Sequence, residues 1–442
     1  FCRVMRALLG AARRAASAAA CSAANIASKP TGKRLFGATA VVGAAAFSSV
    51  YAFDSAARPD FSLSGAKVMT WGQGGSGQLG FGESTINWLA PRGAEGVDQE
   101  DIVHIAAGWK HTAVLTKEGE VWTFGCGQYG RLGHGDQADQ LTPRLVFGLD
   151  GVKVTSIACG GYHTAAVSDK GELYVWGRGW DGELGSGTTK SADEPQLVSG
   201  LKGKKVVQVS CGDSFTLALT DSGELYSFGT GYEGQLGHGS KTNELAPKKV
   251  EGFGGEKVTK IATGKEHCLA VTESGSLFSW GADDYGQLGV GKRARYMREP
   301  TEVRKLKGMA VDVAGGEYHS AVSTKDGKVY TFGFNKDGQL GNGGVSDQPI
   351  PRSVFHSPSE DGKREELTGI VGVACGGGHT AALTKEGTLW VWGRGRDGQL
   401  GRGSDLESAV APRLSPLLVD ALQGKQVKNV ACGADHTVAI VL

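Results

Sequence analysis

A repeat of about 52 residues runs through most of the chain and constrains its fold more than any other feature. The glycine-rich element WGRGWDGELGSG begins at residue 176, and related elements begin at residues 71, 124, 228, 280, 332 and 392. A second element, IACGGYHTAAVSDKG from residue 157, recurs at nearly the same step. A fixed period of this length indicates an architecture built from one repeated supersecondary unit.

The glycine element raises the possibility of nucleotide binding, because Gly177, Gly179 and Gly182 have the GxGxxG spacing of a dinucleotide-binding loop. Seven copies exceed what nucleotide binding needs, and each is followed by another glycine-rich turn and a proline instead of a helix. Asp283 and Asn335 replace the middle glycine in two copies, and these residue types tolerate a left-handed backbone. We interpret the element as a tight turn and expect no nucleotide, other cofactor or metal.

Each repeat unit also contains short apolar runs such as TAVLT and VWTFG, separated by turns such as KEG and DSG. Such runs are typical of half-buried antiparallel strands. About four strands per unit, repeated around a ring, predict an all-β chain with the β-propeller fold. The seven copies predict seven blades.

The two ends of the repeat region complement each other. The strand near residues 66–73 has no histidine-containing strand before it, and the last histidine-containing strand, within residues 427–442, has no partner after it. We expect these segments to pair and close the ring, which removes the exposed edges of an open array. The propeller is therefore predicted to span residues 66–442.

The elements CGxxHTxAL, GxLYxWG and GxxGQLGxG resemble the regulator of chromosome condensation repeat over about residues 65–442. The resemblance implies a seven-bladed propeller but no single function. The family includes a guanine-nucleotide exchange factor, a plant ultraviolet photoreceptor, domains of large ubiquitin ligases and mitochondrial membrane proteins. What these members share is a platform for protein contacts.

The histidines occupy one repeat position in six units, and Phe215 holds that position in the third unit. They are His111, His163, His267, His319, His379 and His436. A catalytic histidine occurs once and beside a partner, so we predict a buried packing and hydrogen-bonding role and no enzymatic activity. Four cysteines share another repeat position on different units and are expected to be free thiols, namely Cys159, Cys211, Cys375 and Cys432.

The tryptophan pattern argues against light sensing. The photoreceptor of this family depends on tryptophans from GWRHT-type motifs in adjacent blades, whereas GWKHT occurs once here, with Trp109. The equivalent positions hold Tyr162, Ser214, Glu266, Tyr318, Gly378 and Asp435. We therefore exclude a photoreceptor that works through such a cluster.

The first 53 residues differ in composition from the rest. They contain seven Lys or Arg residues and no acid, whereas the remaining chain holds 40 basic and 46 acidic residues. A mildly acidic propeller argues against nucleic-acid binding. Residues 1–34, rich in Ala, Ser and Arg, resemble a mitochondrial targeting segment in composition. Because the chain starts at Phe1 and not at Met, we expect this leader to be retained.

Residues 35–53 form an uncharged stretch just long enough to cross a bilayer as a helix. A buried or interfacial helix is the alternative. Basic residues before the stretch predict the N-terminus in the matrix and the propeller in the intermembrane space. Residues 54–65 would then link an inner-membrane helix to the propeller.

Two segments break the repeat. Residues 291–308 form a basic loop expected to bind acidic headgroups or an acidic subunit, with a solvated loop as the alternative. Its basic residues are Lys292, Arg293, Arg295, Arg298, Arg304, Lys305 and Lys307. Residues 353–369 form a charged insertion that is either a partner-binding finger or a tolerated extension.

Two classes of function remain open. The first is a non-enzymatic scaffold on the mitochondrial inner membrane, an accessory subunit or assembly factor of a respiratory-chain or other membrane complex. The resemblance to membrane-anchored mitochondrial members of the family favours it. The second is a guanine-nucleotide exchange factor for an organellar small GTPase, because such a protein needs no catalytic motif of its own.

Overall fold

The computed structural model describes residues 65–442 except 85–86, 98–100, 293, 357–363 and 404–409. The predicted leader, membrane helix and linker therefore lie outside the described residues. No helix within the described residues is long and apolar enough to span a membrane.

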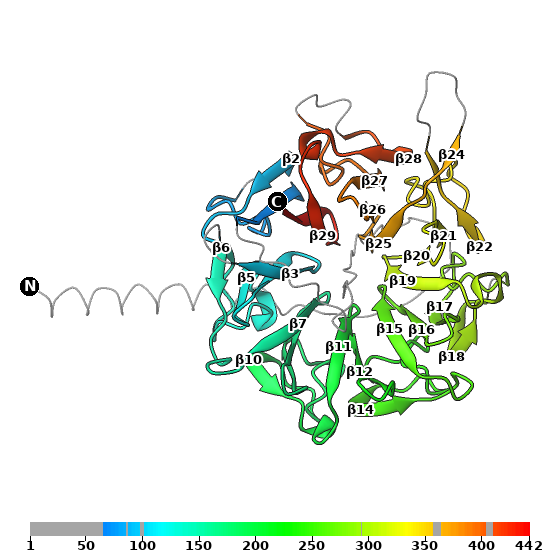
Figure 1. The fold of residues 1–442 in the computed structure, drawn as a ribbon. Helices are drawn as coiled ribbons and strands as arrows, with labels where there is room; N and C mark the ends of the chain where they lie inside the picture. The colour runs from blue at the N-terminus through cyan, green and yellow to red at the C-terminus, as the bar shows by residue number, and fades with distance from the viewer. Residues whose placement is uncertain (1–64, 85–86, 98–100, 293, 357–363, 404–409) are drawn as a thin grey trace, which may run out of the picture. The chain divides into compact units, whose positions relative to one another are not determined.

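Seven four-stranded antiparallel sheets stand around a common axis as the blades of a propeller (Figure 1). Blade 1 contains β3 (Ile102–Ala107), β4 (His111–Thr116), β5 (Val121–Gly125) and β6 (Gln140–Leu145). Blade 2 contains β7 (Val154–Cys159), β8 (His163–Ser168), β9 (Leu173–Gly177) and β10 (Ala192–Leu197). Blade 3 contains β11 (Val206–Cys211), β12 (Phe215–Thr220), β13 (Leu225–Gly229) and β14 (Glu244–Val250).

The remaining blades repeat this order from the inner to the outer strand. Blade 4 contains β15 (Val258–Thr263), β16 (His267–Thr272), β17 (Leu277–Ala282) and β18 (Tyr296–Glu302). Blade 5 contains β19 (Ala310–Gly315), β20 (His319–Thr324), β21 (Val329–Gly333) and β22 (Gln348–Ser353). Blade 6 contains β25 (Ile370–Cys375), β26 (His379–Thr384), β27 (Leu389–Gly393) and β28 (Arg413–Leu418). Short 3-10 turns are η1 (Gln128–Gly130), η2 (Ser199–Leu201), η3 (Arg304–Leu306) and η4 (Asp420–Leu422).

Blade 7 is built from both ends of the repeat region, as predicted. It combines β29 (Val427–Cys432) and β30 (His436–Val441) with β1 (Lys67–Gln73) and β2 (Asn87–Gly93). Strands β1 and β30 pair from Lys67 opposite Val441 to Gly72 opposite His436. The ring therefore closes through hydrogen bonds between strands instead of leaving two free edges.

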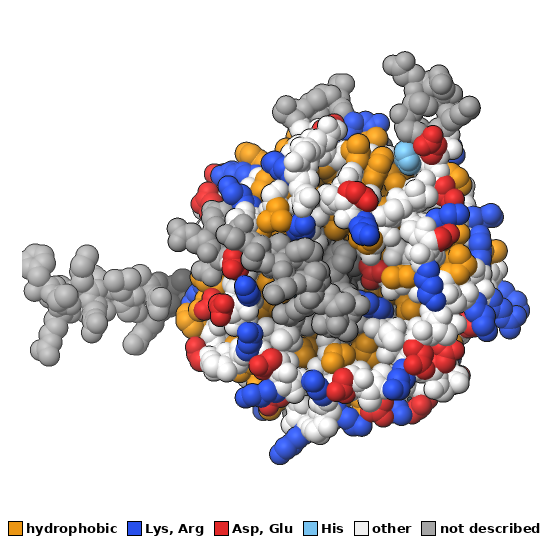
Figure 2. Space-filling view, in the orientation of Figure 1, with side chains coloured by type: hydrophobic (Ala, Val, Ile, Leu, Met, Phe, Trp, Pro, Cys, Tyr) orange, Lys and Arg blue, Asp and Glu red, His pale blue; other side chains and the backbone are white. Residues whose placement is uncertain are grey.

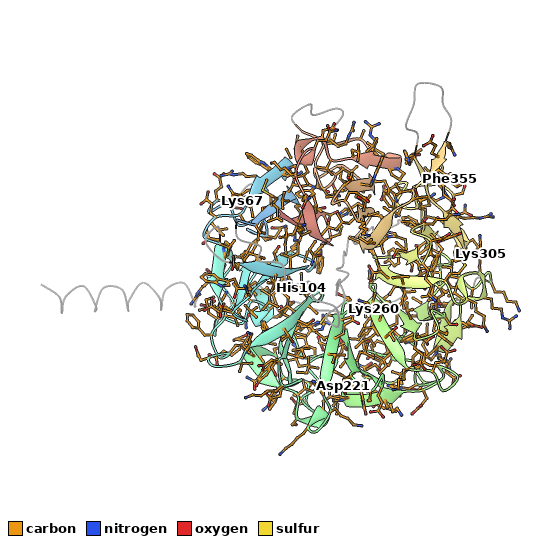
Figure 3. All side chains as sticks on the ribbon, in the orientation of Figure 1. Lys67, His104, Asp221, Lys260, Lys305 and Phe355 are labelled. Atoms are coloured by element: carbon orange, nitrogen blue, oxygen red, sulfur yellow. The ribbon has the colours of Figure 1, made fainter. Side chains whose placement is uncertain are left out.

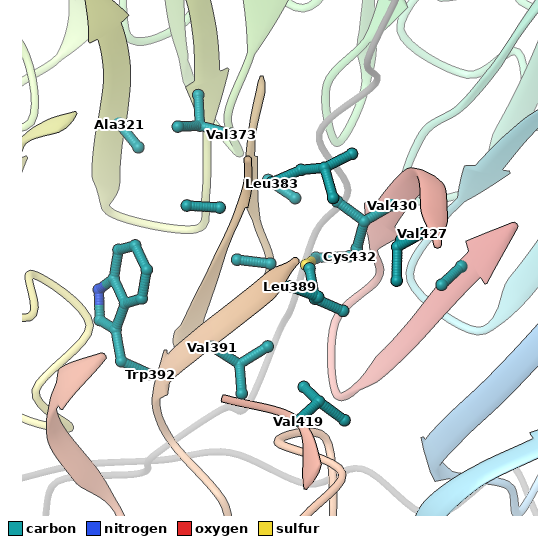
Figure 4. Packing of buried hydrophobic residues seen from close by; sticks show 14 of the residues in the cluster. Ala321, Val373, Leu383, Leu389, Val391, Trp392, Val419, Val427, Val430 and Cys432 are labelled. Atoms are coloured by element: carbon teal, nitrogen blue, oxygen red, sulfur yellow. The ribbon is translucent and has the colours of Figure 1, made fainter. Parts of the chain in front are cut away.

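The hydrophobic core lies between neighbouring blades. Every residue of the second strands, such as β8, is buried, because both faces of each sheet pack against other blades. The prediction of half-buried strands is wrong for these strands, which read as continuous apolar runs for that reason. Figure 4 shows one such layer, in which Leu383, Leu389 and Val391 of blade 6 lie beside Val430 and Cys432 of blade 7. The four repeat-position cysteines are fully buried free thiols, as predicted.

Six hydrogen bonds between neighbouring blades form a ring around the propeller axis. In each, Nε2 of a fully buried histidine lies 2.9–3.0 Å from the Thr or Ser hydroxyl on the second strand of the next blade. Each hydroxyl also donates to a backbone carbonyl, as Thr164 does to Arg131 at 2.7 Å. The hydroxyl must therefore accept from the histidine, which fixes the neutral tautomer with its proton on Nε2. We call each unit a histidine clip, and the predicted packing and hydrogen-bonding role is confirmed.

A glycine under each ring is needed for space. A Cβ atom added to Gly108 would lie 2.3 Å from Cε1 of His111, and one added to Gly212 would lie 2.0 Å from Cε1 of Phe215. Neither glycine has a positive φ. The glycine before each clip is therefore fixed by the aromatic ring that lies against it.

The seventh clip is missing between blades 3 and 4. Phe215 replaces the histidine, and Cys268 replaces the hydroxyl residue that would face it. The Cys268 thiol still donates to a backbone carbonyl, that of Gln235, at 3.2 Å. This boundary therefore keeps the packing of the other boundaries but lacks the side-chain hydrogen bond.

One prediction about the glycine turns is wrong. The middle glycines, such as Gly179, are not in the left-handed region, and neither are Asp283 and Asn335. A Cβ atom on Gly179 would instead lie 2.2 Å from the carbonyl oxygen of Lys190. Asp283 and Asn335 use their side-chain oxygens to accept N–H groups of their own turns at 3.0 Å. Close approach of two loops, and not left-handed backbone, selects glycine at this position.

We expect Phe215→His to be tolerated better than His163→Ala. The cavity at this position accepts either ring, whereas removing the ring should lower the free energy of unfolding by about 2–4 kcal/mol. Denaturant unfolding of the two variants measures the difference. Equal losses would contradict the packing role.

The pair Phe215→His with Cys268→Thr provides the matched control. Together the two changes should rebuild the seventh clip, so the double variant should exceed the sum of the single variants by about 1 kcal/mol. A purely additive result would argue against the hydrogen-bond geometry described above.

Stability should fall as the pH drops below about 6.5. Burial lowers the pKa of His163, His267, His319 and His379 to about 3. Between pH 6.5 and 3 these histidines are therefore protonated in the unfolded chain but not in the folded chain. The free energy of unfolding falls by up to about 1.4 kcal/mol per histidine for each pH unit in this range. Asp213 and Glu317, whose pKa burial raises to about 7, offset part of the loss because they take up protons in the folded state.

Denaturant unfolding across pH 7.5 to 4.5 measures this dependence. His163→Phe removes one of these titrating histidines and keeps an aromatic ring in the cavity, as Phe215 does naturally. Its slope against pH should be shallower by about 1.4 kcal/mol per unit between pH 6 and 4. An unchanged slope would show that His163 is protonated in the folded protein.

Candidate functional site

One end of the propeller carries inner loops and outer turns whose side chains differ between repeats. Seven inner loops join the first two strands of each blade, and seven outer turns follow the third strands. A backbone hydrogen bond ties each turn to its loop, for example from Arg178 to Tyr162 at 3.0 Å and from Thr230 to Ser214 at 2.9 Å. We call the combined surface the mouth face. Its inner loops are 108–110, 160–162, 212–214, 264–266, 316–318, 376–378 and 433–435, and its outer turns are 73–78, 126–131, 178–183, 230–235, 282–287, 334–339 and 394–399.

Four aromatic side chains cluster on the mouth face at blades 1 and 2. Trp109 contacts Tyr162 edge-on with ring centres 4.9 Å apart, and Tyr129 lies 5.7 Å from Tyr162 and 5.0 Å from Trp180. Edge-on aromatic contacts of this kind add to the stabilisation from burial alone. Trp180 closes the cluster toward solvent with 56% of its surface exposed.

Two arginines lie within this aromatic cluster. The guanidinium of Arg178 lies 4.6 Å from the centre of the Tyr162 ring, and that of Arg131 lies 5.1 Å from the same ring. Arg178 also pairs with the buried carboxylate of Glu183 at 2.8 Å. Arg131 is 1% exposed and forms no ion pair with a described residue, so aromatic faces and backbone carbonyls hold its charge.

The backbone beneath the cluster is strained because Arg131 replaces a glutamine. In five turns the glutamine Oε1 accepts the N–H two residues earlier, and Glu183 does the same in a sixth. Arg131 offers no acceptor. The turn instead forms η1, in which Tyr129 has φ 65°, the only positive φ of a non-glycine among the described residues. Trp176 also loses the carbonyl partner that its three counterparts keep.

Charged residues on the mouth face pair across blades at two further positions. Lys265 lies 2.9 Å from the Tyr318 hydroxyl and 3.5 Å from the Glu317 carboxylate. Arg394 lies 2.8 Å from Asp337 and 3.4 Å from Asp435. Lys265 thus contacts the inner loop of blade 5, and Arg394 of blade 6 lies between carboxylates of blades 5 and 7.

The carboxyl groups of the inner loops share one electrostatic property. Burial raises the pKa of all four of these groups, which belong to Asp213, Glu266, Glu317 and Asp435. The raised pKa is about 7 for Asp213 and Glu317. For Glu266 the neighbouring carboxylates of Glu233 and Asp284 raise the pKa further. The carboxyl groups of the inner loops are therefore poorly solvated.

The predicted basic loop is largely an outer strand. Strand β18 occupies its centre, Arg295 precedes β18, and η3 follows it. The described basic residues are exposed at the edge of the propeller, where Figure 2 shows blue side chains beside β18 and Figure 3 places Lys305. Because β18 spans roughly 20 Å, Arg295 and Arg304 lie near opposite ends of it. They form a stripe from the mouth face toward the other face, and Arg293 lies outside the described residues.

The second repeat-breaking segment forms a short hairpin. Strands β23 (Phe355–His356) and β24 (Glu365–Glu366) pair between blades 5 and 6, where β23 contacts β28 (Figure 1). Its base is anchored by buried Val354 and Leu367, and His356 packs against Trp390 at 4.7 Å. Residues 357–363 between the strands lie outside the described residues.

The sequence contained a signal for the mouth face that the search for chemical motifs missed. Arg131 and Glu183 stand where the other five turns have glutamine, and they belong to adjacent blades. In the described residues, no three His, Cys, Asp or Glu side chains are grouped as a metal site. The arrangement provides aromatic anchors and paired charges, which suits binding of another macromolecule.

Arg131→Gln should stabilise the propeller by about 1–2 kcal/mol. The change removes a buried cation without a counter-ion and returns the acceptor that the Tyr129 N–H lacks. Thermal unfolding measures the gain, and near-ultraviolet circular dichroism should report altered packing of Tyr129 and Trp180. Gln235→Asn, which withdraws the acceptor from a regular turn, should have the opposite sign. A loss of stability in Arg131→Gln would show that the arginine supports the fold.

Comparison with known proteins agrees with the repeat and the fold. The family model for the RCC1-like domain matches residues 67–440. The ultraviolet-B receptor UVR8 of Arabidopsis thaliana is 37% identical over 369 residues, 83% of this chain and 82% of that protein. The mitochondrial RCC1 domain-containing protein RUG3 of Arabidopsis thaliana is 36% identical over 322 residues, 71% of each chain.

Solved structures give the same result. The structure of human WBSCR16 superimposes with a TM-score of 0.73 and 26% identity over 85% of this chain and all of that chain. Its ring of blades therefore matches the one described above. The chain belongs to the family of RCC1-like seven-bladed propellers.

Proposed function

We propose that this protein is a non-enzymatic mitochondrial scaffold whose mouth face binds a partner protein. The observation that carries the proposal is the pair Trp180 and Tyr232, which project from equivalent turns of adjacent blades with 56% and 60% of their surfaces exposed. Tryptophan, tyrosine and arginine dominate the binding energy of protein interfaces. Trp180 contacts the Tyr129 ring and the Arg178 guanidinium, so its own ring is oriented before a partner arrives.

The strain at Tyr129 supports the same surface. A left-handed tyrosine costs about 1–3 kcal/mol and persists only when its surroundings enforce it. Here the strained residue holds the aromatic cluster together at its centre, in contact with Tyr162 and Trp180. The fold thus retains an unfavourable backbone where an interface would need fixed aromatic side chains.

The mitochondrial location rests on the leader composition and on the similarity to mitochondrial RUG3. Within the proposal, residues 35–53 tether the protein to the inner membrane with the propeller in the intermembrane space. Their alanines and glycines contribute little transfer energy, so the helix would need partner helices around it. We therefore propose an accessory subunit or assembly factor of a respiratory-chain or other membrane complex.

The basic stripe along β18 provides a second contact in this proposal. Arg295, Arg298 and Arg304 are exposed and lie along one edge of blade 4. Acidic headgroups or an acidic subunit would complement them, together with Lys292, Lys305 and Lys307. The Lys305 amine already donates to the carbonyl of Pro351, which orients the end of the stripe.

Native electrophoresis of carbonate-washed mitochondrial membranes tests the proposal. The full-length protein should migrate with a larger assembly, and Trp180→Ala with Tyr232→Ala should release most of it because the aromatic anchors are lost. Leu197→Ala, which removes a 52% exposed leucine from β10, is the matched control and should change nothing. Unchanged migration of the double variant would overturn the mouth-face interface.

Two other outcomes would redirect the proposal. If the protein washes off the membrane with carbonate, the predicted tether is wrong. Accelerated nucleotide release from a purified mitochondrial GTPase, lost in the Trp180→Ala and Tyr232→Ala variant, would identify an exchange factor instead.

A further inference from the structure

Two arginine side chains of the mouth face occupy the same repeat position, and their contacts show how this face binds a positively charged group. Arg178 and Arg394 occupy the same repeat position, the first residue of their outer turns. Arg394 reaches Asp435 on the inner loop of the next blade at 3.4 Å, and Arg178 donates to Ser214 at the corresponding place. Each arginine also pairs with a carboxylate of an outer turn, Asp337 or Asp181.

Blades 3 and 4 present the carboxylates but no arginine at the outer-turn position, and Lys265 of the inner loop of blade 4 directs its amine to Tyr318 and Glu317 of blade 5. Thr230 occupies the arginine position in blade 3, and Glu266 occupies the position of Asp435 in the next inner loop. Asp213, Glu266 and Asp284 form no ion pair with any described residue. Glu233 has only Arg295, at 3.8 Å, and that arginine is mostly exposed. We call these four carboxylates with Tyr232 the acidic slot.

Two carboxylate oxygens of the acidic slot also lack hydrogen-bond donors. Oδ1 of Asp213 and Oε2 of Glu233 are buried and have no hydrogen-bond partner among the described residues. Such atoms cost free energy unless a donor reaches them. Burial raises the pKa of Asp213 and Glu266, and neighbouring carboxylates add to the rise. Lys265 lowers the pKa of both groups, and Arg178 lowers that of Asp213, but the pKa of each stays raised, so these cations compensate the negative charge only in part.

We propose that the acidic slot receives an arginine or lysine side chain of the partner protein, placed where Arg178 and Arg394 stand in their own blades. Tyr232, at the rim, supplies an exposed aromatic face for the incoming cation. Lys265 beside Tyr318 shows this combination within the chain, with the amine 5.1 Å from the ring centre and 3.5 Å from the Glu317 carboxylate. The inference rests on the proposed function, because it specifies the chemistry of the partner at the same face.

Three observations assign the occupant to a basic segment. The exposed apolar group at the slot is one tyrosine, too little for an apolar helix to cover. The surrounding charge is negative and desolvated, so an acidic segment would be repelled. The repeat also defines a position for one cation and its carboxylate partners, which matches a single Lys or Arg side chain better than a broad electrostatic patch.

The test supplies the missing cation within the chain. Thr230→Arg should place a guanidinium beside Glu266 and Glu233, as Arg394 lies beside Asp435. It should raise the melting temperature and weaken binding of the partner by at least tenfold. Ser222→Arg adds the same charge on the exposed turn at the opposite end of blade 3, and it should do neither.

A peptide probe measures the chemistry directly. Fluorescein-labelled peptides of alternating arginine and alanine, or of alternating glutamate and alanine, are titrated with full-length protein at low and high salt. The arginine peptide should bind, more weakly at high salt, and lose about tenfold in affinity with Glu233→Gln and Glu266→Gln together. Glu251→Gln, at a 77% exposed carboxylate of the same blade, is the control and should bind as the wild type does.

The outcomes separate this inference from the proposed function. If Trp180→Ala with Tyr232→Ala releases the native partner while Thr230→Arg leaves it bound, the mouth face is an interface and the slot assignment fails. Equal binding of the arginine and glutamate peptides, or no effect of the glutamine substitutions, would also overturn it. Self-association of the protein that Thr230→Arg abolishes would overturn the assignment to a separate partner.

Discussion

Packing of a buried His or Phe ring between neighbouring blades, joined at six of the seven described boundaries by a hydrogen bond to a hydroxyl, is the interaction on which the ring of blades depends. Each blade presents two faces to its neighbours, so its stability comes from packing between blades rather than within one. The Thr164 hydroxyl, for example, accepts a hydrogen bond from His111 and donates one to the backbone carbonyl of Arg131. The imidazole, the hydroxyl and the carbonyl together fix the spacing of the two blades. A neutral imidazole is required, because Nδ1 of each clip histidine has no acceptor among the described residues.

The same clip explains why the mouth face can vary. The clip and the glycine beneath it set the path of each inner loop, and a backbone hydrogen bond then sets the outer turn. Side chains at the remaining loop positions are not part of the clips, so they can differ between blades. Loops on a rigid scaffold are where binding residues accumulate. The contrast between Arg178 and Thr230, at one backbone position, shows how much chemistry this allows.

The mouth face is therefore best understood by comparing the blades with each other. Five turns carry glutamine at one position, and Arg131 and Glu183 depart from it where the aromatic cluster stands. Two turns carry arginine at another position, and the acidic slot lies where it is absent. Blades 1 and 2, which carry Arg131 and Glu183, are followed directly by blades 3 and 4, which carry the acidic slot. The aromatic anchors and the carboxylates therefore lie next to each other on the mouth face. A partner that covers this arc would meet apolar, cationic and anionic groups in a fixed order.

The sequence by itself determined the ring, because a period that repeats seven times leaves one way to bury every apolar strand. It also determined the closure between residues 66–73 and 427–442 and the structural role of His163 and its counterparts. It misjudged the middle glycines, because contact between Gly179 and the loop at Lys190 depends on two segments whose approach has no local signature. It read the residues around β18 as a loop, because their basic composition hides the strand. Only the tertiary structure decided that Trp180, Arg131 and Glu266 share one face, since each comes from a different blade and only the closed ring brings them together.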